Sequence, residues 1–338
     1  MKRKYMIIVL MAGALELTGC SQGTSNSAKN GTTGSENTII SESDIAILDT
    51  EDMFTERDRD TEYDESECTA ISLSDEETKC DSDGVKMDGQ TVTITEGGTY
   101  LLTGSLSNGS VVVDTDKTEK VQLILENVSI INEEGAGICV EQADKVFITL
   151  ADGSTNKIVS NSFTGNEDTN IDGAIFSRED LTLNGSGTLK ITSAAHGIVS
   201  KDDLVLTGGV YQIQSEKQGL SGKESVRIAD GTFTITSGTD AIHSEDTDED
   251  TKGFVYITGG VLTLAAGGDG ISSSYVVQAD GGSFDISTSS TETDTSTKGI
   301  KAQKYVILKD GTYQLATADD GIHCNGNVYV CGGTYSIN

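Results

Sequence analysis

The sequence predicts an all-β protein folded as a parallel β-helix, a solenoid with about 22 residues per coil. Three observations predict it. Short apolar segments alternate with period two, no segment has an amphipathic helical stripe, and a Gly-Ile or Gly-Leu type unit recurs down the C-terminal half. The opening apolar residue of this unit recurs at steps of 22, 23 or 29 residues: Ile175, Ile198, Leu220, Ile242, Ile271, Ile300 and Ile322.

Residues 1–19 have the features of a signal peptide. Basic residues at positions 2–4 precede the apolar segment at 6–15, which is too short for an ordinary membrane span. The segment ends in Leu17-Thr18-Gly19-Cys20, which resembles the lipobox of bacterial lipoproteins. That resemblance implies cleavage before Cys20 and lipidation of this residue. We therefore expect the protein at the extracellular face of the cell membrane, attached through the lipid alone.

Residues 20–53 predict a flexible acidic linker. The segment is rich in Ser, Thr, Gly, Asn and acidic residues, and its one apolar island is Ile45-Ala46-Ile47-Leu48. Residues 54–338 are patterned and are expected to form the β-helix domain. Its first strands are expected at Ala70–Leu73, Thr91–Thr95, Thr99–Leu102, Val111–Val113, Val121–Leu125 and Val146–Leu150.

Alignment of the later units separates inward from outward positions. Two inward columns follow the Gly-Gly or Asp-Gly corner of each unit, and they start at Leu189 and Ile191. The column between them is outward and polar: Lys190, Gln212, Thr234, Thr263, Asp285, Gln314 and Ser336. A second strand alternates in the same way and a third is shorter. Three strands in 22 residues fit a β-helix, whereas a propeller blade needs roughly 40–50 residues.

Two coils carry insertions, at residues 243–253 and 287–297, which account for the two 29-residue steps. The first is acidic and the second is rich in Ser and Thr. Insertions in solenoids tend to fall on one face, often the binding face, but a tolerated surface loop explains them equally well.

The charge of the chain restricts its partners. The sequence has 338 residues and a formal net charge of −31, with 39 Gly, no Pro and no Trp. Such an acidic chain is not expected to bind nucleic acid, because phosphates need a basic surface. Abundant carboxylates suit Ca²⁺, which takes oxygen ligands, although acidic residues also serve solubility alone.

Several segments together resemble a family of secreted bacterial β-helix carbohydrate-binding proteins, first described in a cellulolytic clostridium. They include Gly98–Leu106 (GTYLLTGSL), Asp144–Gly153 (DKVFITLADG), Asp172–Ile175 (DGAI), Ser200–Leu204 (SKDDL), Gly268–Ile271 (GDGI) and Lys298–Ala302 (KGIKA). The similarity covers residues 54–338. It implies a right-handed parallel β-helix, bound calcium, binding of cellulose or acidic pectic polymers, and kinship with β-helix pectate lyases.

Acidic residues before the Gly-Ile pairs are the predicted calcium ligands. The outward column there reads Asp172, His196, Gln218, Asp240, Asp269, Lys298 and Asp320. Asp240 and Asp269 lie in successive coils, about 5 Å apart, where their carboxylates repel one another unless a cation intervenes. Asp246, Asp248 and Asp320 complete the expected metal site. The alternative is that these side chains bind turn amides.

Stacked basic residues are the predicted contacts for an acidic sugar. Arg178, Lys201 and Lys223 recur in successive coils, and an acidic residue follows each of them. They are suited to hold uronate carboxylates, although local pairing of alternating charges is the simpler interpretation. The coil that contains His196 and Lys201 is expected to contact the sugar, while calcium is expected further along.

Aromatic, histidine and cysteine residues give further expectations. Tyr211, Tyr313 and Tyr335 fall in an inward column and predict a core ladder, whereas Tyr256, Tyr275, Tyr305 and Tyr329 are expected to be more exposed. The three histidines are too far apart for a common metal site and are expected to be surface or hydrogen-bonding residues. Cys68 and Cys80 flank a strand-turn pattern and are candidates for a disulfide.

These observations favour a monomeric, surface-anchored, non-catalytic carbohydrate-binding protein with structural calcium. One alternative is a calcium-dependent pectate lyase, for which Lys298 or Lys301 would be the base that removes the C5 proton. A second alternative is a structural adhesin whose coils only display loops.

Overall fold

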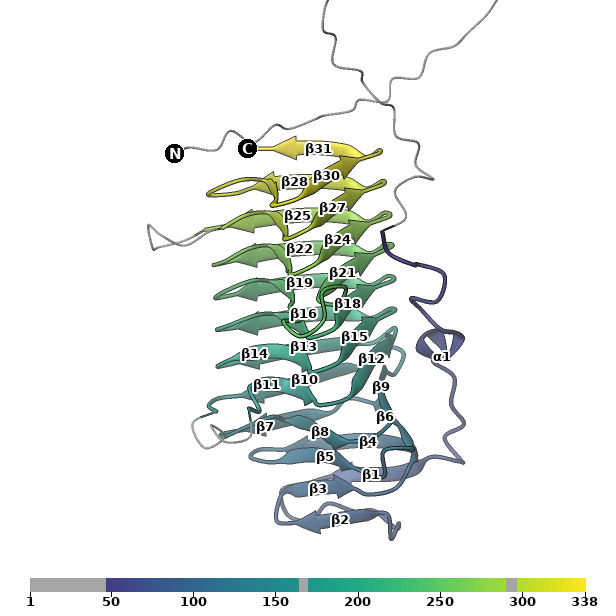
Figure 1. Ribbon diagram of the computed structural model, residues 1–338. Coiled ribbons are helices and arrows are strands. Elements are labelled where there is room, and N and C mark those ends of the chain that lie inside the picture. The colour runs from purple at the N-terminus through teal and green to yellow at the C-terminus, as the bar shows by residue number, and fades with distance from the viewer. Residues whose placement is uncertain (1–46, 164–169, 290–296) are drawn as a thin grey trace, which may run out of the picture.

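The computed structural model describes residues 47–163, 170–289 and 297–338, and it confirms the predicted parallel β-helix (Figure 1). The coils stack along one axis, with the N-terminal coils at the bottom of the figure and β31 at the top. No helix in the described part of the chain is long and apolar enough to cross a membrane. Cys20 and most of the expected linker lie outside the described residues.

Each coil contributes one strand to each of three faces. Face A contains β1 (Thr69–Leu73), β4 (Gly98–Leu106), β6 (Lys120–Leu125), β9 (Lys145–Leu150), β12 (Asp180–Gly185), β15 (Asp203–Leu206), β18 (Ser225–Ile228), β21 (Phe254–Ile257), β24 (Val276–Ala279), β27 (Tyr305–Leu308) and β30 (Asn327–Val330). Face B contains β2 (Val85–Asp88), β3 (Thr91–Ile94), β5 (Ser110–Asp114), β8 (Ile138–Gln142), β11 (Gly173–Ser177), β14 (His196–Ser200), β17 (Leu220–Gly222), β20 (Ile242–Ser244), β23 (Ile271–Ser273), β26 (Ile300–Ala302) and β29 (Ile322–Cys324). Face C contains β7 (Ser129–Asn132), β10 (Thr155–Ser160), β13 (Thr188–Ser193), β16 (Val210–Ser215), β19 (Thr232–Ser237), β22 (Val261–Ala266), β25 (Ser283–Thr288), β28 (Thr312–Ala316) and β31 (Thr334–Ile337).

Parallel pairing in register builds these faces. Ile198 pairs with Leu220, and Leu220 pairs with Ile242, so each partner lies one 22-residue coil further along. Faces A and C join in one 20-stranded sheet because the long strand β4 takes part in both, while face B is a separate 11-stranded sheet. Only the β2–β3 pair is antiparallel among the named strands, and it closes the N-terminal end.

The inward columns form one continuous core. Tyr211 stacks on Phe233 with ring centroids 4.8 Å apart, and Tyr313 stacks on Phe284 and Tyr335 at 4.7 Å. Tyr211 and Tyr313 are fully buried, which confirms the predicted core ladder. The corner before each ladder residue needs glycine. Gly311, for example, has φ = +125° and its Cα lies so close to Gly282 that a Cβ would meet that carbonyl oxygen at 2.9 Å.

The N-terminal segment from residue 47 to Asp60, which we call the strap, runs along the outside of face A (Figure 1). It contains the four-residue helix α1 (Glu56–Arg59), whose N-cap Thr55 forms a capping box with Asp58. Ile47, Leu48, Met53 and Phe54 pack against apolar side chains of β21, β24 and β27. The described end of the expected linker therefore lies against the β-helix.

The strap accounts for a wrong prediction about Tyr256. This side chain is 4% exposed, because the ring of Phe54 stacks over it at 5.8 Å. The other three tyrosines expected to be exposed are half-buried around the same apolar cluster. Outward apolar residues on face A are thus covered by the chain itself.

Cys68 and Cys80 do not form the disulfide considered from the sequence, because both are free thiols in the structure. The Cys68 thiol donates a hydrogen bond to the Asp64 carbonyl, while Cys80 packs against the main core. The two thiols therefore lie in different environments.

Candidate functional site

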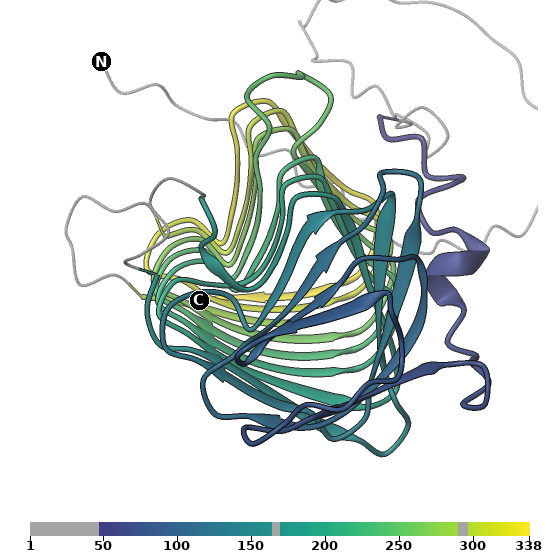
Figure 2. The same cartoon turned by 90° about the horizontal axis from the view of Figure 1, so that it is seen from below.

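The candidate site is a groove on the outer side of face B. Seen along the axis, face B lies on the concave side of each coil, next to the loop that contains residues 245–253 (Figure 2). A hollow of about 320 Å³ runs over β14, β17 and β20, and we call it the face-B groove. The polar side chains that line it include Asp172, His196, Lys201, Gln218, Lys223 and His243.

The structure brings two members of the predicted basic ladder into this groove. Lys201 and Lys223 lie in successive coils, with side chains 38% and 41% exposed. Lys201 lies 3.6 Å from a carboxylate oxygen of Asp172, and Lys223 lies 2.8 Å from Asp248 in the first insertion. These pairs are exposed enough for solvent to weaken them, so both lysines remain accessible to an anionic group from outside the protein.

Arg178, the third member of the ladder, lies one coil earlier. Its Nε forms an ion pair with Glu141 at 2.6 Å, and its guanidinium lies 5.4 Å from the centroid of the Phe176 ring. The Lys201 ammonium lies over the same ring at 5.4 Å. Both cations are therefore oriented by an aromatic face as well as by carboxylates.

The histidines are hydrogen-bonded, as the sequence predicted. His243 contacts Asp240 through Nδ1 at 2.8 Å and Glu245 through Nε2 at 3.6 Å. Burial lowers the pKa of His243, but the hydrogen bond and charge of Asp240, together with Glu245, outweigh it, so the pKa is raised. His196 lies 3.4 Å from Asp172, and its Nδ1 accepts a hydrogen bond from the Gln218 backbone. Protonation of His243 adds positive charge to the groove.

The carboxylates of the predicted metal site are engaged by the protein. Asp240 accepts the backbone N–H of Asp269 at 2.7 Å, and Asp269 accepts that of Lys298 at 2.7 Å. The second oxygen of Asp240 contacts His243, and that of Asp269 contacts Lys301 at 2.6 Å. These side chains stabilise the turns between coils, which is the alternative considered from the sequence.

The remaining three predicted ligands lie elsewhere. Asp246 accepts two backbone N–H groups within its own loop, from Asp248 at 2.7 Å and Glu249 at 2.9 Å. Asp320 lies 3.0 Å from His323 and 3.4 Å from Lys298. Among the described residues, no three of the five predicted carboxylates gather around one point.

A different carboxylate cluster lies at the corner between faces B and A. Ligand atoms of Asp180, Asp202 and Asp203 all lie within 4.8 Å of one another. Burial, and then the charges of Asp180, Glu224 and Asp203, raise the pKa of Asp202 to about 6. The pKa of Asp180 is raised by burial and by Asp203. We call Asp180, Asp202 and Asp203 the corner cluster.

Sequence reasoning missed the corner cluster, although a signal was present. An acidic residue follows each base of the ladder, and in two successive coils a second acid comes next, at Asp180 and Asp203. The parallel register places equivalent positions one above the other, so these acids approach each other across coils. Arg227 offsets part of this charge through its ion pair with Asp203.

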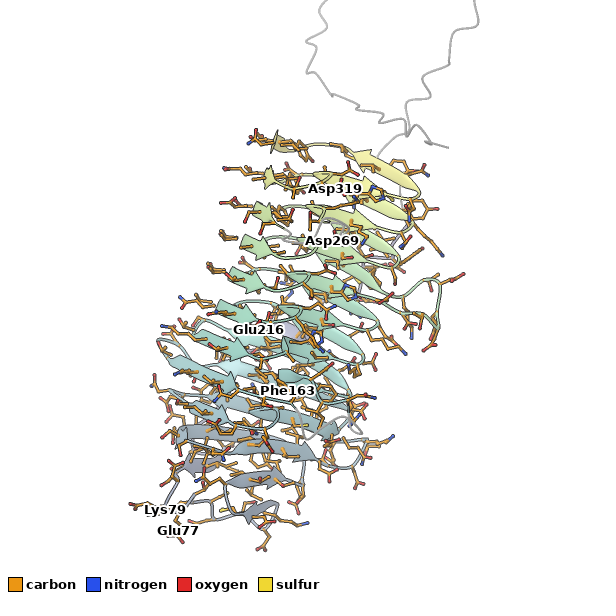
Figure 3. All side chains as sticks on the ribbon, turned by 90° about the vertical axis from the view of Figure 1, so that its left-hand side faces the viewer. Glu77, Lys79, Phe163, Glu216, Asp269 and Asp319 are labelled. Carbon is orange, nitrogen blue, oxygen red and sulfur yellow. The ribbon has the colours of Figure 1, made fainter. Side chains whose placement is uncertain are left out.

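The two lysines considered as lyase bases are both held by acids. Lys301 contacts Asp269, whose side chain is 3% exposed, and the Lys298 ammonium lies 2.5 Å from Asp319. Figure 3 shows Asp269 and Asp319 on the same side of the helix, at different heights along its axis. Burial lowers the pKa of Lys298, but hydrogen bonds and charges from Asp319 and Asp320 outweigh it and raise this pKa. A base must be neutral, so this environment disfavours Lys298 in that role.

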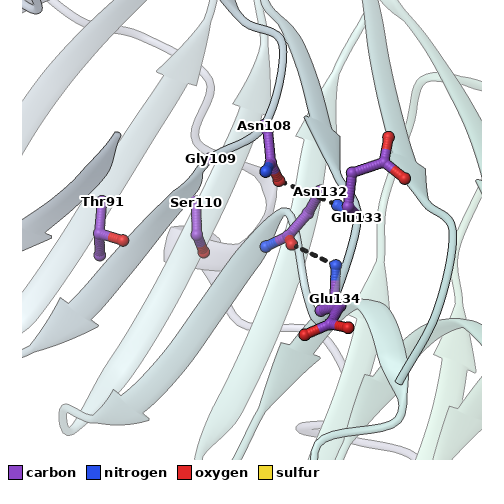
Figure 4. Close-up of a pocket in the computed structure, with 7 residues that line it drawn as sticks. All are labelled: Thr91, Asn108, Gly109, Ser110, Asn132, Glu133 and Glu134. Atoms are coloured by element: carbon purple, nitrogen blue, oxygen red, sulfur yellow. Dashed lines mark hydrogen bonds between the residues drawn. The ribbon is translucent and has the colours of Figure 1, made fainter. Parts of the chain in front are cut away.

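A second hollow, of about 380 Å³, lies over the N-terminal coils (Figure 4). Its Asn108 and Asn132 side chains accept the backbone N–H groups of Glu133 and Glu134 at 3.1 and 3.0 Å. The residues that line it include two glutamates and no base. This hollow is therefore unsuited to an anionic ligand.

Comparisons with known proteins agree on a carbohydrate-related family. A family model described as "Carbohydrate-binding domain-containing protein" matches residues 88–338. A protein of the same description from Acetivibrio thermocellus is 34% identical over 137 residues, which are 39% of this chain and 48% of that protein. The match thus spans about half the length of that relative.

A solved structure is also similar. It is described as the polysaccharide lyase-like protein from C. thermocellum, in a gadolinium derivative. It shares 29% identity with this chain, with a TM-score of 0.63, and the superposition covers 79% of this chain and all of that one.

Proposed function

The chain belongs to the family of carbohydrate-binding domain-containing proteins, and from this premise we propose that it binds an acidic plant-type polysaccharide, such as polygalacturonate, in the face-B groove. The observation that supports this most directly is the pairing of Lys201 and Lys223 in one groove. They repeat with the coil spacing, so they present cations at regular intervals along the axis. A polymer with a carboxylate on each sugar can meet several of them at once.

Substitution of the groove lysines tests this proposal. The double variant Lys201→Gln/Lys223→Gln should bind polygalacturonate at least about tenfold more weakly in a pull-down or by calorimetry, because two charge-assisted hydrogen bonds are lost. The matched control is Lys157→Gln/Lys190→Gln, since these exposed lysines also face each other across adjacent coils but lie on face C. Equal losses in both variants would contradict the groove. A wild-type protein that retains no glycan on an array would favour the structural adhesin instead.

We further propose that calcium assists binding, with the corner cluster as its ligands. Three carboxylates close together supply the oxygen donors that Ca²⁺ takes. The pKa values of Asp180 and Asp202 are raised by burial and then by neighbouring negative charge, and a cation would relieve both effects. The five carboxylates expected from the sequence are less suited to bind calcium, because backbone amides and cationic side chains of the protein already contact their oxygens. Bound calcium would supply positive charge beside Lys201, where the uronate approaches. Chelation should therefore weaken polygalacturonate binding.

We propose binding without cleavage, because the two candidate bases, Lys298 and Lys301, are both held in ion pairs with acids. The lyase alternative retains one argument, the likeness to a structure described as polysaccharide lyase-like. Incubation with polygalacturonate and Ca²⁺ at about pH 7–10 tests it. We expect no absorbance from unsaturated uronate products, and their appearance would establish elimination.

We also propose that a lipid on Cys20 anchors the protein outside the cell membrane. Support comes from the Leu17-Thr18-Gly19-Cys20 sequence and the short apolar segment before it. Metabolic labelling with a clickable fatty acid should mark the wild type and not Cys20→Ala. A labelled Cys20→Ala protein would contradict this site.

A further inference from the structure

Face A binds the strap through the strap's backbone. The side-chain amide of Asn184 donates hydrogen bonds to the carbonyls of Asp58 and Asp60, at 3.2 and 2.9 Å. The Thr207 hydroxyl donates to the same Asp58 carbonyl at 2.7 Å. Contacts with backbone groups of this kind are how peptide-binding sites hold an extended ligand.

Strap side chains also meet matching partners on face A. The Arg57 guanidinium donates a hydrogen bond to the Gln122 side chain at 2.8 Å and lies 4.8 Å from the centroid of the Phe147 ring. The Phe54 ring stacks on Tyr256 further along the same face. A cation and an aromatic ring of the strap thus each have a specific contact on the β-helix.

The groups that hold the strap are oriented by one another. The Thr149 hydroxyl accepts a hydrogen bond from Gln122 at 3.0 Å and donates one to the side-chain carbonyl of Asn184 at 2.7 Å. This contact directs the side-chain NH₂ group of Asn184 to the strap. All three side chains are at most 3% exposed. The network therefore fixes the donors of face A in place, which lowers the entropy cost of binding a peptide.

The strap has little structure of its own. Its helix α1 is four residues long, and isolated helices this short are not stable in water. Residues 61–68 join the strap to β1, and six of them are exposed (Figure 1). The contacts named above join the strap to residues at least 65 positions further along the chain. The same contacts can therefore form between two copies, as in domain swapping.

We propose that face A is a peptide-binding site that accepts the strap of a second copy, so that two copies of this chain pair by exchanging straps. Residues 61–68 reach about 26 Å when extended, which exceeds the roughly 10 Å between packed sheets. A tethered strap has an effective concentration on the order of 1 mM at its own site. Dilute protein is therefore monomeric, as expected from the sequence, and exchange begins as the protein concentration approaches that value.

A labelled peptide of residues 47–60 tests the site. It should bind the full-length Asp58→Ala protein, whose own strap is weakened, and raise the fluorescence anisotropy of the label. The same peptide with Asp58→Ala should bind at least about tenfold more weakly, because it lacks the carboxylate that Lys145 and Thr182 contact. The matched control peptide carries Glu56→Ala, at an exposed position, and should bind as the unsubstituted peptide does.

A mixture of two variants tests the second copy as the occupant. The Lys145→Met protein keeps an intact strap and loses its own site, whereas Asp58→Ala keeps the site. At about 50 µM, well below the effective concentration of a tethered strap, each alone should be monomeric and their mixture should form a 1:1 dimer by light scattering and native mass spectrometry. Lys120→Met is the matched control, because Lys120 pairs with Lys145 in the adjacent coil, is exposed and contacts Asp144. Its mixture with Asp58→Ala should stay monomeric.

The wild type gives a readout without any substitution in the site, which holds even where Lys145→Met alters the fold. Near 1 mM, the wild type should contain a dimer that Asp58→Ala lacks. A peptide that fails to bind the Asp58→Ala protein, or that binds equally with and without its own Asp58, would overturn face A as a peptide site.

Two other outcomes would overturn the exchange of straps. One is a peptide that binds while the mixture stays monomeric, since residues 61–68 would then not reach a second copy. The other is a dimer that the wild type and Asp58→Ala form equally. None of these outcomes depends on glycan binding, because the groove lies on face B.

Discussion

At the scale of single residues, two groups of acidic side chains in this protein have opposite surroundings. Some are held by local partners: Asp240 and Asp269 accept backbone amides and contact His243 and Lys301, so each of these two carboxylates already has partners. The corner cluster is different, because Asp202 has no such compensation and its pKa is raised to about 6. Charge that is left uncompensated costs stability, and it marks the place where a cation has most to offer.

The variant Asp202→Asn should show this cost. The pKa of Asp202 in the folded wild type lies above the ordinary value of 3.8, so the folded state holds this proton more tightly than the unfolded state does. The stability of the wild type therefore falls as the pH rises from about 4 to 6, and the loss persists above pH 6. At pH 8 without calcium, the variant should be about 1 kcal/mol more stable than the wild type in chemical unfolding. Calcium should raise the Tm of the wild type and not of the variant. Asp248→Asn, at a carboxylate with a 71% exposed side chain, is the control and should keep the calcium response.

For His243, the change of stability with pH has the opposite cause, because here the charged form is the stabilising one. Its pKa is raised above the ordinary 6.5, so its ion pair with Asp240 stabilises fully below about pH 6.5, and this contribution is lost as the pH rises through the folded pKa. His243→Gln should lose about 1 kcal/mol at pH 5.5 and much less at pH 9, measured by unfolding at both pH values. His323→Gln is the matched control, because its partner Asp320 is 56% exposed and the pair contributes little.

At the scale of elements, the strap decides which surface the protein can use. It is fixed to face A by Asp58, whose side chain is 2% exposed, lies 2.9 Å from the Lys145 ammonium and accepts a hydrogen bond from Thr182 at 2.7 Å. Burial raises the pKa of Asp58, but Lys145 and Thr182 outweigh it and lower the pKa. The resulting stabilisation is present above about pH 4 and is lost as the pH falls through the lowered pKa.

Asp58→Ala should therefore release the strap without unfolding the β-helix. The substitution removes the Asp58 half of the capping box and the partner of Lys145, at a cost of about 2–3 kcal/mol, and separation of the strap lets Lys145 regain water. Hydrogen exchange in residues 47–60 should rise strongly, while exchange in the core strands and the global Tm change little. Glu56→Ala, at an exposed position in the same helix, should leave exchange as in the wild type. Unchanged exchange in Asp58→Ala would show that the apolar contacts alone hold the strap.

At the scale of the whole molecule, the β-helix behaves as a stack in which each coil contacts its neighbours. Stability is then close to a sum of coil and interface contributions. Phe233→Ala should cost about 3–5 kcal/mol, because the ring fills the core and stacks on Tyr211 at 4.8 Å. The loss of hydrogen-exchange protection should begin in the coils on either side. Thr234→Ala, the next residue along the same strand, points outward and should change the unfolding free energy by less than about 0.5 kcal/mol.

Much of this fold could be predicted from local pattern. The repeat spacing and the alternation at positions such as Leu189 to Ile191 specify the strands and the inward columns, because side-chain direction in a strand has period two. Parallel stacking then follows from the equal spacing of like residues. The basic ladder of Lys201 and Lys223 was predicted for the same reason, since residues one period apart lie in adjacent coils.

What the sequence by itself determined is therefore the β-helix, its core and its family. The tertiary structure alone decided the position of the strap, the partners of the turn carboxylates and the corner cluster, because these features depend on contacts between residues with no fixed spacing in the sequence. The strap buries Tyr256 from more than 190 residues away in the chain, and turn geometry directs the oxygens of Asp240 and Asp269 to amides and bases. The corner cluster forms because the coil corner brings side chains from two rungs to one point. Periodicity fixes which residues share a column, but the path of the turns and the position of the chain's own N-terminal segment decide which columns reach solvent.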